Sequence, residues 1–354
     1  MTSNVQKVID VDVHQTERSS QQLLEFLPEP WKSRYARSGT GNSGLSLHNP
    51  IGVMRSDCKP PSGGPSASDP DFMVVDLLEP YNIEHVILTG GMMGISTMHD
   101  PDFSAAIASA YNDQLVKYWL ETKHSHFYGS ILVSSFDPVQ AAREIDRMAA
   151  HPKMVGVIMC SAHRQPLGQR NFYPIYEAAS RHGLPVAIHP GNEGSGGTPP
   201  PTGHGYPTRY LEWHTSLSQN YMVQLASLIC EGTFEKFPKL KFVLLEGGIA
   251  WLPGFMWQMD KAYKQLKATM PWLKRLPSEY IRDHCLLSTQ PIEEPEDPKH
   301  LINIFDMIDA ENFLMFSTDY PHWDNDMPTE ILRKLRPEAK HKIYYENAKK
   351  LYNI

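Results

Sequence analysis

Residues 8–14 read VIDVDVH, and this stretch decides the fold. It is rich in β-branched residues, carries acidic side chains at alternate positions, and ends in Asp12 and His14. Short apolar runs of this kind occur eight times along the chain, and segments with helical apolar spacing separate them. Strands that alternate with helices indicate right-handed crossovers and a parallel sheet. Eight such strands predict a closed (β/α)8 barrel of the TIM type.

The length of the chain leaves room for insertions in such a barrel. A barrel usually takes roughly 250 residues, and this chain has 354. We expect one domain over residues 1–354, with insertions at 39–71, at 190–213 and around strand seven at 270–298, the first two over the catalytic face; a flexible surface insertion is the alternative for 39–71. The predicted strands are 8–13, 85–89, 127–133, 155–159, 185–189, 241–246, 285–288 and 313–317, and predicted helices include 103–120, 138–150, 173–182, 217–234 and 253–270.

Composition excludes several classes of protein. The chain is 41% hydrophobic and 21% charged, with a net charge of -7, which is typical of an ordinary globular protein. It has no basic segment of the kind that binds nucleic acid or an anionic membrane. Four cysteines without a CxxC pair indicate neither a zinc ribbon nor a disulfide framework. The N-terminal segment has no apolar run of signal-peptide length, so we expect a cytoplasmic protein.

Acidic and imidazole side chains stand at the ends of four predicted strands. Charged groups there are costly to bury unless they are paired, protonated or metal-bound. Taken singly, each has an ordinary interpretation, such as a hydrogen-bonded histidine or a helix-capping aspartate. Together they exceed what one ion pair needs, and they predict a site for two cations with shared carboxylates. The predicted ligands are Asp12, His14, His189, Glu246, Asp319 and His322.

Several motifs along nearly the whole chain resemble the amidohydrolase-related family (amidohydrolase family 2) of the amidohydrolase superfamily. The resemblance implies a distorted (β/α)8-barrel metalloenzyme acting on a small or medium organic substrate. The motifs are VIDVDVH (8–14), GLPVAIHPG (183–191), GTFEKFPKLKFVLLEGGIAWLP (232–253), PSEYIR (277–282), FSTDYPHWD (316–324) and YYENAKKLYNI (344–354).

The sequence departs from the better-known family members in ways that affect the predicted reaction. Decarboxylases and hydratases of the family carry His-x-His on strand one and a histidine after strand six, where this chain has Asp12 and Glu246. The resemblance therefore favours the dinuclear oxygenase branch, with two iron ions or one manganese and one iron. It implies Glu246 or Asp319 as a bridging ligand, Tyr206 or Tyr210 as a phenolate ligand, and an external electron donor.

Two alternatives to the oxygenase stay open. The first is a hydrolase or decarboxylase, in which a metal-activated water, on zinc for example, would give its proton to Asp319. The second is a non-catalytic subunit paired with a paralogous one. We also expect a homodimer. Further candidates for contact with the ligands or the substrate are His204, His214, Arg282 and Trp323.

Overall fold

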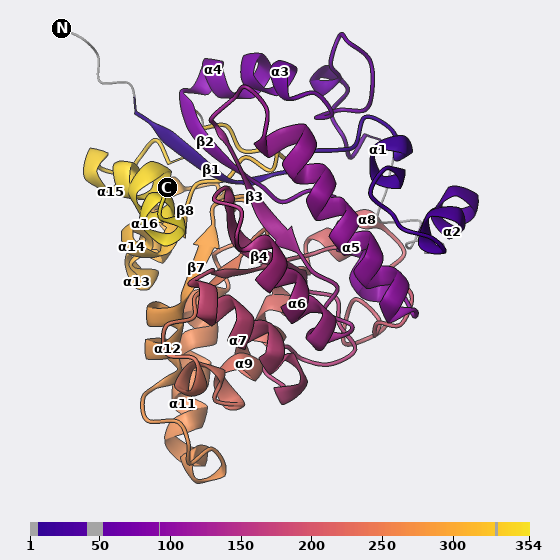
Figure 1. Cartoon of the computed structure of the whole chain (residues 1–354). Helices are drawn as coiled ribbons and strands as arrows, with labels where there is room; N and C mark the ends of the chain where they lie inside the picture. The colour runs from indigo at the N-terminus through magenta and orange to yellow at the C-terminus, as the bar shows by residue number, and fades with distance from the viewer. Residues whose placement is uncertain (1–5, 41–51, 92, 330–331) are drawn as a thin grey trace, which may run out of the picture.

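The computed structural model describes residues 6–40, 52–91, 93–329 and 332–354, and its strands lie inside a surround of helices (Figure 1). Each strand pairs in parallel with the next in chain order, from β1 to β8, so the predicted (β/α)8 barrel is confirmed. Residues 41–51, within the predicted insertion 39–71, lie outside the described residues. The strands are β1 (Val8–Val13), β2 (Ile83–Leu88), β3 (Phe127–Leu132), β4 (Met154–Cys160), β5 (Val186–His189), β6 (Phe242–Leu244), β7 (Cys285–Ser288) and β8 (Leu314–Met315).

Backbone hydrogen bonds join the segment after β8 to β1 and so close the barrel. The amide of Val11 donates to the carbonyl oxygen of Phe316 at 3.0 Å. Farther along, the amide of Asp319 donates to the carbonyl oxygen of Asp12 at 3.1 Å. Every residue of β1 is buried. The closure therefore fixes two predicted ligands, distant in the chain, next to each other at one mouth of the barrel.

Four of the helices begin with an Asp-Pro pair. The aspartate side chain accepts hydrogen bonds from the first free backbone amides, and the proline supplies a φ angle that suits the first turn. The helices are α1 (Ser20–Leu24), α2 (Trp31–Ser38), α3 (Pro70–Met73), α4 (Glu79–Tyr81), α5 (Pro101–Leu115), α6 (Pro138–Met148), α7 (Tyr173–His182), α8 (Tyr210–His214), α9 (Ser218–Cys230), α10 (Thr233–Lys236), α11 (Leu252–Leu266), α12 (Pro277–His284), α13 (Pro298–Ile308), α14 (Ala310–Phe313), α15 (Pro337–His341) and α16 (Asn347–Tyr352).

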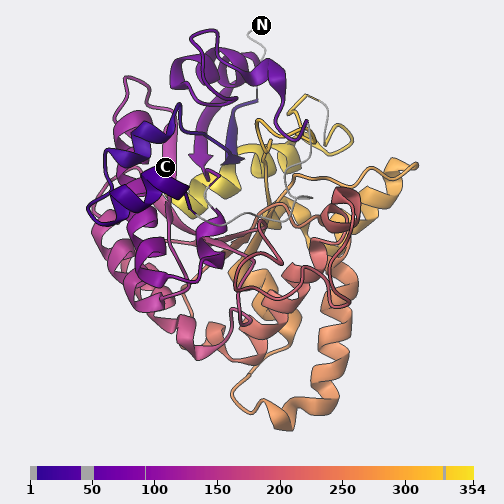
Figure 2. The ribbon, with the colours of Figure 1, turned by 90° about the vertical axis from the view of Figure 1, so that its right-hand side faces the viewer.

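The predicted helices are present, and one of them is divided. The segment predicted as a helix over 217–234 forms α9 and α10, because Gly232 adopts a left-handed φ of 76° between them. Helix α11 extends away from the barrel (Figure 2). Within the described part of the chain, we find no helix with the length and apolar character needed to cross a membrane.

The cap of α6 gives a test of the helix starts. Oδ1 of Asp137 accepts hydrogen bonds from the amides of Val139 and Gln140 at 3.0 and 3.1 Å. We expect Asp137→Ala to lower the free energy of unfolding by about 1 kcal/mol, because those amides lose their acceptor. Urea titration measures the change. Asp137→Asn keeps an acceptor at this position and should stay close to wild type; an equal loss in both variants would contradict the capping role.

Candidate metal centre

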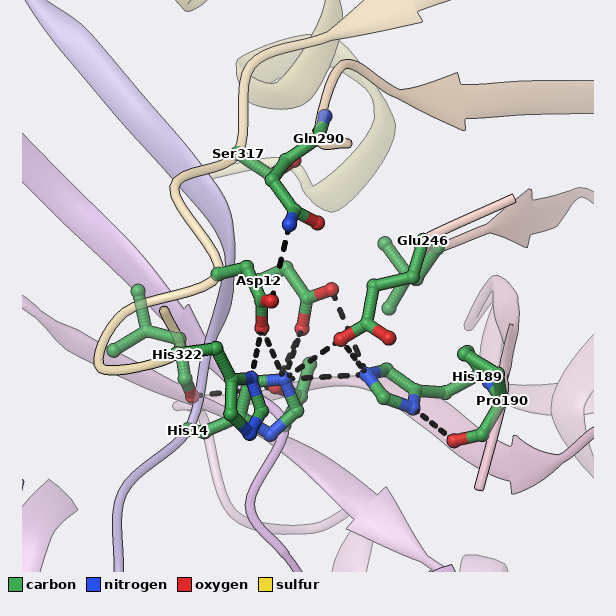
Figure 3. A network of polar contacts seen from close by, with 12 residues as sticks. Asp12, His14, His189, Pro190, Glu246, Gln290, Ser317 and His322 are labelled. Atoms are coloured by element: carbon green, nitrogen blue, oxygen red, sulfur yellow. Dashed lines mark hydrogen bonds and ion pairs between the residues drawn. The ribbon is translucent and has the colours of Figure 1, made fainter. Parts of the chain in front are cut away.

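The six predicted ligands come together at the carboxyl ends of the strands. Figure 3 labels Asp12, His14, His189, Glu246 and His322 among them. They form two groups that share His14 and Glu246, and within each group the possible donor atoms lie within 4.8 Å of one another. Because the two groups share members, they make one continuous centre. The first group is Asp12, His14, His189 and Glu246, and the second is His14, Glu246, Asp319 and His322.

Both histidines of the first group are oriented by the backbone. Nδ1 of His14 lies 2.6 Å from the carbonyl oxygen of Gly90, and Nδ1 of His189 lies 2.6 Å from that of Pro190. A carbonyl oxygen only accepts, so each Nδ1 carries the proton. This arrangement leaves both Nε2 atoms facing the centre, 3.2 Å apart. Two nitrogen lone pairs at this distance repel each other unless a proton or a cation lies with them.

Carboxylate oxygens surround the two Nε2 atoms. Oε1 of Glu246 lies 2.8 Å from Nε2 of His189 and 3.3 Å from Nε2 of His14. Oδ1 of Asp319 lies 3.0 Å from Nε2 of His14, and Oδ1 of Asp12 lies 3.4 Å from it. Oδ2 of Asp12 is buried and accepts no hydrogen bond from the described residues. Imidazole nitrogens and carboxylate oxygens with an unused buried oxygen fit a divalent cation such as Mn²⁺, Fe²⁺ or Zn²⁺.

The charges of the centre perturb one another. Burial alone would lower the pKa of His14, but Asp12 and the other carboxylates outweigh burial and raise it well above its ordinary value. At His189 the same opposition raises the pKa to about 9. Burial, followed by repulsion from Glu246, raises the pKa of Asp319 well above its ordinary value. The centre therefore draws positive charge onto its imidazoles, and a bound cation would supply that charge in place of protons.

Two of the carboxylates stand on an unusual backbone. Glu246 and Asp319 have φ angles of 54° and 60°, in the left-handed region. For residues other than glycine this conformation costs on the order of 1–3 kcal/mol and is concentrated at functional sites. It turns the chain sharply after β6 and β8 and aims both side chains into the mouth of the barrel.

Neighbouring polar side chains fix the carboxylates in place. The hydroxyl of Thr89 donates to Oδ1 of Asp12 at 2.7 Å. The side-chain amide of Gln290 donates to Oδ2 of Asp319 at 3.1 Å. On its other oxygen, Asp319 meets Nδ1 of His322 at 2.5 Å. Burial, and then the nearby His14, lower the pKa of His322 to about 4, so its ring is neutral.

The sequence predictions missed Asp10, Gln290 and Asp324. Oδ2 of Asp10 accepts a hydrogen bond from the Thr318 hydroxyl at 2.5 Å, beneath the centre. Gln290 follows β7 just as the predicted ligands follow their own strands, so the same rule, extended to neutral polar residues, would have found it. Asp324 lies two positions after His322, within a motif that was already recognised.

A cavity of about 310 Å³ opens onto the centre. Five of the six predicted ligands line it, all except Asp12. Loops after the strands supply other parts of its wall, including Thr40 and Val53 from the 39–71 segment and Asn192 from the 190–213 segment. Helix α8 adds Tyr210, Trp213 and His214, and the segment after β8 adds Asp324.

Other predicted site residues lie away from the centre. Tyr206 is 60% exposed and His204 is also exposed, and neither lines the cavity. Arg282 donates to the carbonyl oxygens at the end of α13, Met307 and Ile308, at 3.2 Å each. Its guanidinium therefore caps a helix.

Of the two remaining aromatic candidates, Tyr210 lines the cavity and Trp323 contacts Tyr210. The indole N–H of the exposed Trp323 donates to the hydroxyl oxygen of Tyr210 at 3.4 Å. Burial raises the pKa of Tyr210 well above its ordinary value. The role of Tyr210 as a phenolate ligand stays a prediction.

Known decarboxylases resemble this chain in sequence and in fold. Gamma-resorcylate decarboxylase of Polaromonas sp. (strain JS666 / ATCC BAA-500) is 25% identical over 293 residues, which cover 79% of this chain and 86% of the relative. The solved structure of 2,6-dihydroxybenzoate decarboxylase from Rhizobium matches with a TM-score of 0.69 at 18% identity, covering 98% of this chain and 99% of the other.

A second solved structure contains a metal. It is 5-carboxyvanillate decarboxylase of Novosphingobium aromaticivorans DSM 12444, complexed with manganese and 4-hydroxy-3-methoxy-5-nitrobenzoic acid. It matches with a TM-score of 0.72 at 18% identity and covers 100% of both chains. At these identities the two structures establish the shared fold.

These comparisons overturn the predicted O2-dependent oxygenase. The relatives just described are named as decarboxylases, and the expected external electron donor falls with the oxygenase. The error has a physical cause. Carboxylates and imidazoles bind Mn²⁺ and Zn²⁺ as Lewis acids as readily as they bind redox-active iron, so a surplus of carboxylates does not specify a redox reaction.

The family itself is shown over almost the whole sequence. The predicted resemblance rested on motifs spread from residue 8 to residue 354. The Amidohydrolase family model (Amidohydro_2) matches residues 9–354. The chain belongs to the amidohydrolase family.

Proposed function

We propose that this protein is a divalent-metal-dependent decarboxylase of a small aromatic acid. The observation that carries the proposal is the centre of converging Nε2 atoms and carboxylates beside a cavity of small-molecule size. The decarboxylase relatives, one of them with manganese and a substituted benzoic acid, support it. The sequence left a hydrolase or decarboxylase open as the alternative to the oxygenase, and the proposal takes the decarboxylase.

The first group of ligands would hold the cation. Asp12, His14, His189 and Glu246 present two imidazole nitrogens and two carboxylates, a set that suits Mn²⁺. When bound, the ion would neutralise and orient the oxygen atoms of an acidic substrate. The second ion predicted from the sequence stays a prediction. If it were bound by Asp319 and His322, it would replace the proton that the proposed reaction assigns to this pair.

Two residues of the second group, Asp319 and His322, can hold and donate the proton that decarboxylation requires. When an aromatic acid loses CO2, the bond from the ring to the carboxylate breaks and the ring carbon gains a proton. Asp319 and His322 can hold one proton between Oδ1 and Nδ1, which are 2.5 Å apart. Gln290 restrains the other oxygen of Asp319. We assign this pair as the donor of that proton.

We further propose that the insertions form part of the substrate pocket of a single domain over residues 1–354. Thr40, Val53, Asn192 and Tyr210 line the cavity together with the centre, which supports this role for the described parts of 39–71 and 190–213. Loops after barrel strands commonly carry substrate specificity. The homodimer and the non-catalytic subunit paired with a paralogue stay predictions.

The activity can be tested under argon. We expect the Mn²⁺-loaded enzyme to release CO2 from 2,6-dihydroxybenzoate or a related hydroxybenzoate without O2. Asp319→Asn should lower kcat by about 100-fold or more, because it removes the proton donor. Arg282→Gln should keep wild-type activity, because Arg282 does not line the cavity. Absence of CO2 release from a panel of aromatic acids by the metal-loaded enzyme would refute the proposal.

Metal binding can be tested apart from activity. We expect Mn²⁺ to raise the unfolding temperature of chelator-treated protein, and at a hundred times Kd to add about 2.7 kcal/mol to the free energy of unfolding. His14→Ala should lose both the effect and the bound metal, because His14 belongs to both ligand groups. Elemental analysis counts the ions. Two per wild-type chain would support the predicted second ion, whereas an unchanged metal content in His14→Ala would contradict the assigned centre.

A further inference from the structure

Residues 245–250, which we call the β6 turn, carry Glu246 into the centre. Glu246 has a φ of 54°, its amide donates to the hydroxyl oxygen of Ser288 at 3.1 Å, and its Oε1 lies 2.8 Å from Nε2 of His189 (Figure 3). This backbone conformation costs a glutamate on the order of 1–3 kcal/mol, so it persists only where neighbouring residues enforce it. The residues that hold the β6 turn therefore decide where this carboxylate points.

Glu293, in the loop after β7, binds the last residues of the β6 turn. Its Oε1 accepts hydrogen bonds from the amides of Ile249 and Ala250 at 2.8 and 2.7 Å. Ile249 is fully buried, so water cannot replace the acceptor that Glu293 supplies to its amide. Oε2 of Glu293 is buried and has no hydrogen-bond partner among the described residues. The carboxyl group therefore holds the turn through Oε1.

The backbone of the β6 turn leaves room for this carboxyl group. Gly248 has a φ of 66°, and a Cβ atom at this position would lie 2.9 Å from Oε1 of Glu293. The indole N–H of Trp251 donates to the carbonyl oxygens of Gly247 and Gly248 at 2.9 and 3.1 Å. Glycine at position 248 thus supplies both the conformation and the space that the contact with Glu293 requires.

The loop after β7 is also bound to the segment after β8. The amide of Ile292 donates to Oδ2 of Asp326 at 3.0 Å, and the side-chain amide of Gln290 donates to Oδ2 of Asp319 at 3.1 Å. This loop supplies none of the six predicted ligands. It nevertheless connects the supports of Glu246 and Asp319, the two carboxylates of the centre that have a left-handed backbone.

We propose that Glu293 is a positioning residue of the metal centre, which holds the β6 turn so that Glu246 faces the cation. The inference rests on the proposed metal-dependent function and adds a residue that belongs to neither ligand group and does not line the cavity. Residues that orient metal ligands from outside commonly change metal affinity 10- to 100-fold when they are removed. Glu293 acts through the position of Oε1, and its charge is not required.

Three substitutions of Glu293 separate position from charge. The probe is Mn²⁺, titrated calorimetrically into metal-free protein. Glu293→Ala removes the acceptor and should weaken Kd by about 10- to 100-fold. Glu293→Asp keeps the charge but withdraws it from the two amides, so it should also weaken Kd, and it decides the test if Glu293→Ala does not fold. Glu293→Gln keeps an acceptor oxygen within reach of both amides and should stay close to wild type.

Glu294→Ala is the matched control, because Glu294 is the next residue in the chain and its side chain is exposed. It should bind Mn²⁺ as wild type does. The inference is overturned if wild type does not bind Mn²⁺, if Glu293→Asp binds it as tightly as wild type, or if Glu293→Gln weakens binding as much as Glu293→Asp. The expected order of Kd values without release of CO2 from any aromatic acid would support the inference and refute the decarboxylase.

Discussion

Crowding of like charges at the mouth of the barrel is the constraint on which the site depends. Asp12, Glu246 and Asp319 place carboxylate oxygens within 3.4 Å of Nε2 of His14, in a region where Asp12 and Asp319 are almost fully buried. Three carboxylates this close repel one another strongly unless positive charge lies between them. A bound cation or protonated imidazoles would supply that charge, and the neighbouring hydrogen bonds hold the carboxylates in place.

The sequence predicted the barrel well because burial on both faces gives most of its strands, such as β4, a largely apolar run of residues. It predicted β6 and β8 too long, as 241–246 and 313–317, whereas the strands are Phe242–Leu244 and Leu314–Met315. Both strands end before a ligand that has a positive φ. Glycine and asparagine are the residues that usually predict a left-handed backbone. Glu246 and Asp319 are neither, so the sequence did not predict their positive φ angles or the early ends of the two strands.

The convergence of the candidate ligands was predictable from the sequence, and the reaction was not. A charged residue at the end of an apolar strand is a local pattern, and the barrel topology gathers such residues without further information. The type of reaction depends on which oxygen and nitrogen atoms of the centre are still available after the neighbouring residues have formed their hydrogen bonds. Tyr206 and Tyr210 were equal candidates under the resemblance, but the first is exposed, whereas the hydroxyl of the second lies 3.4 Å from the indole nitrogen of Trp323.

A neutral residue, Gln290, completes the site, and the candidate ligands and the cavity wall stand on different parts of the fold. Gln290 carries no charge and would be overlooked in a search for ligands, but it holds Asp319 on one side and the backbone of Asp324 on the other. The centre stands on strand ends tied together by backbone hydrogen bonds, whereas His214 stands on an inserted helix. Changes in α8 can therefore alter the wall of the cavity while the candidate ligands keep their positions.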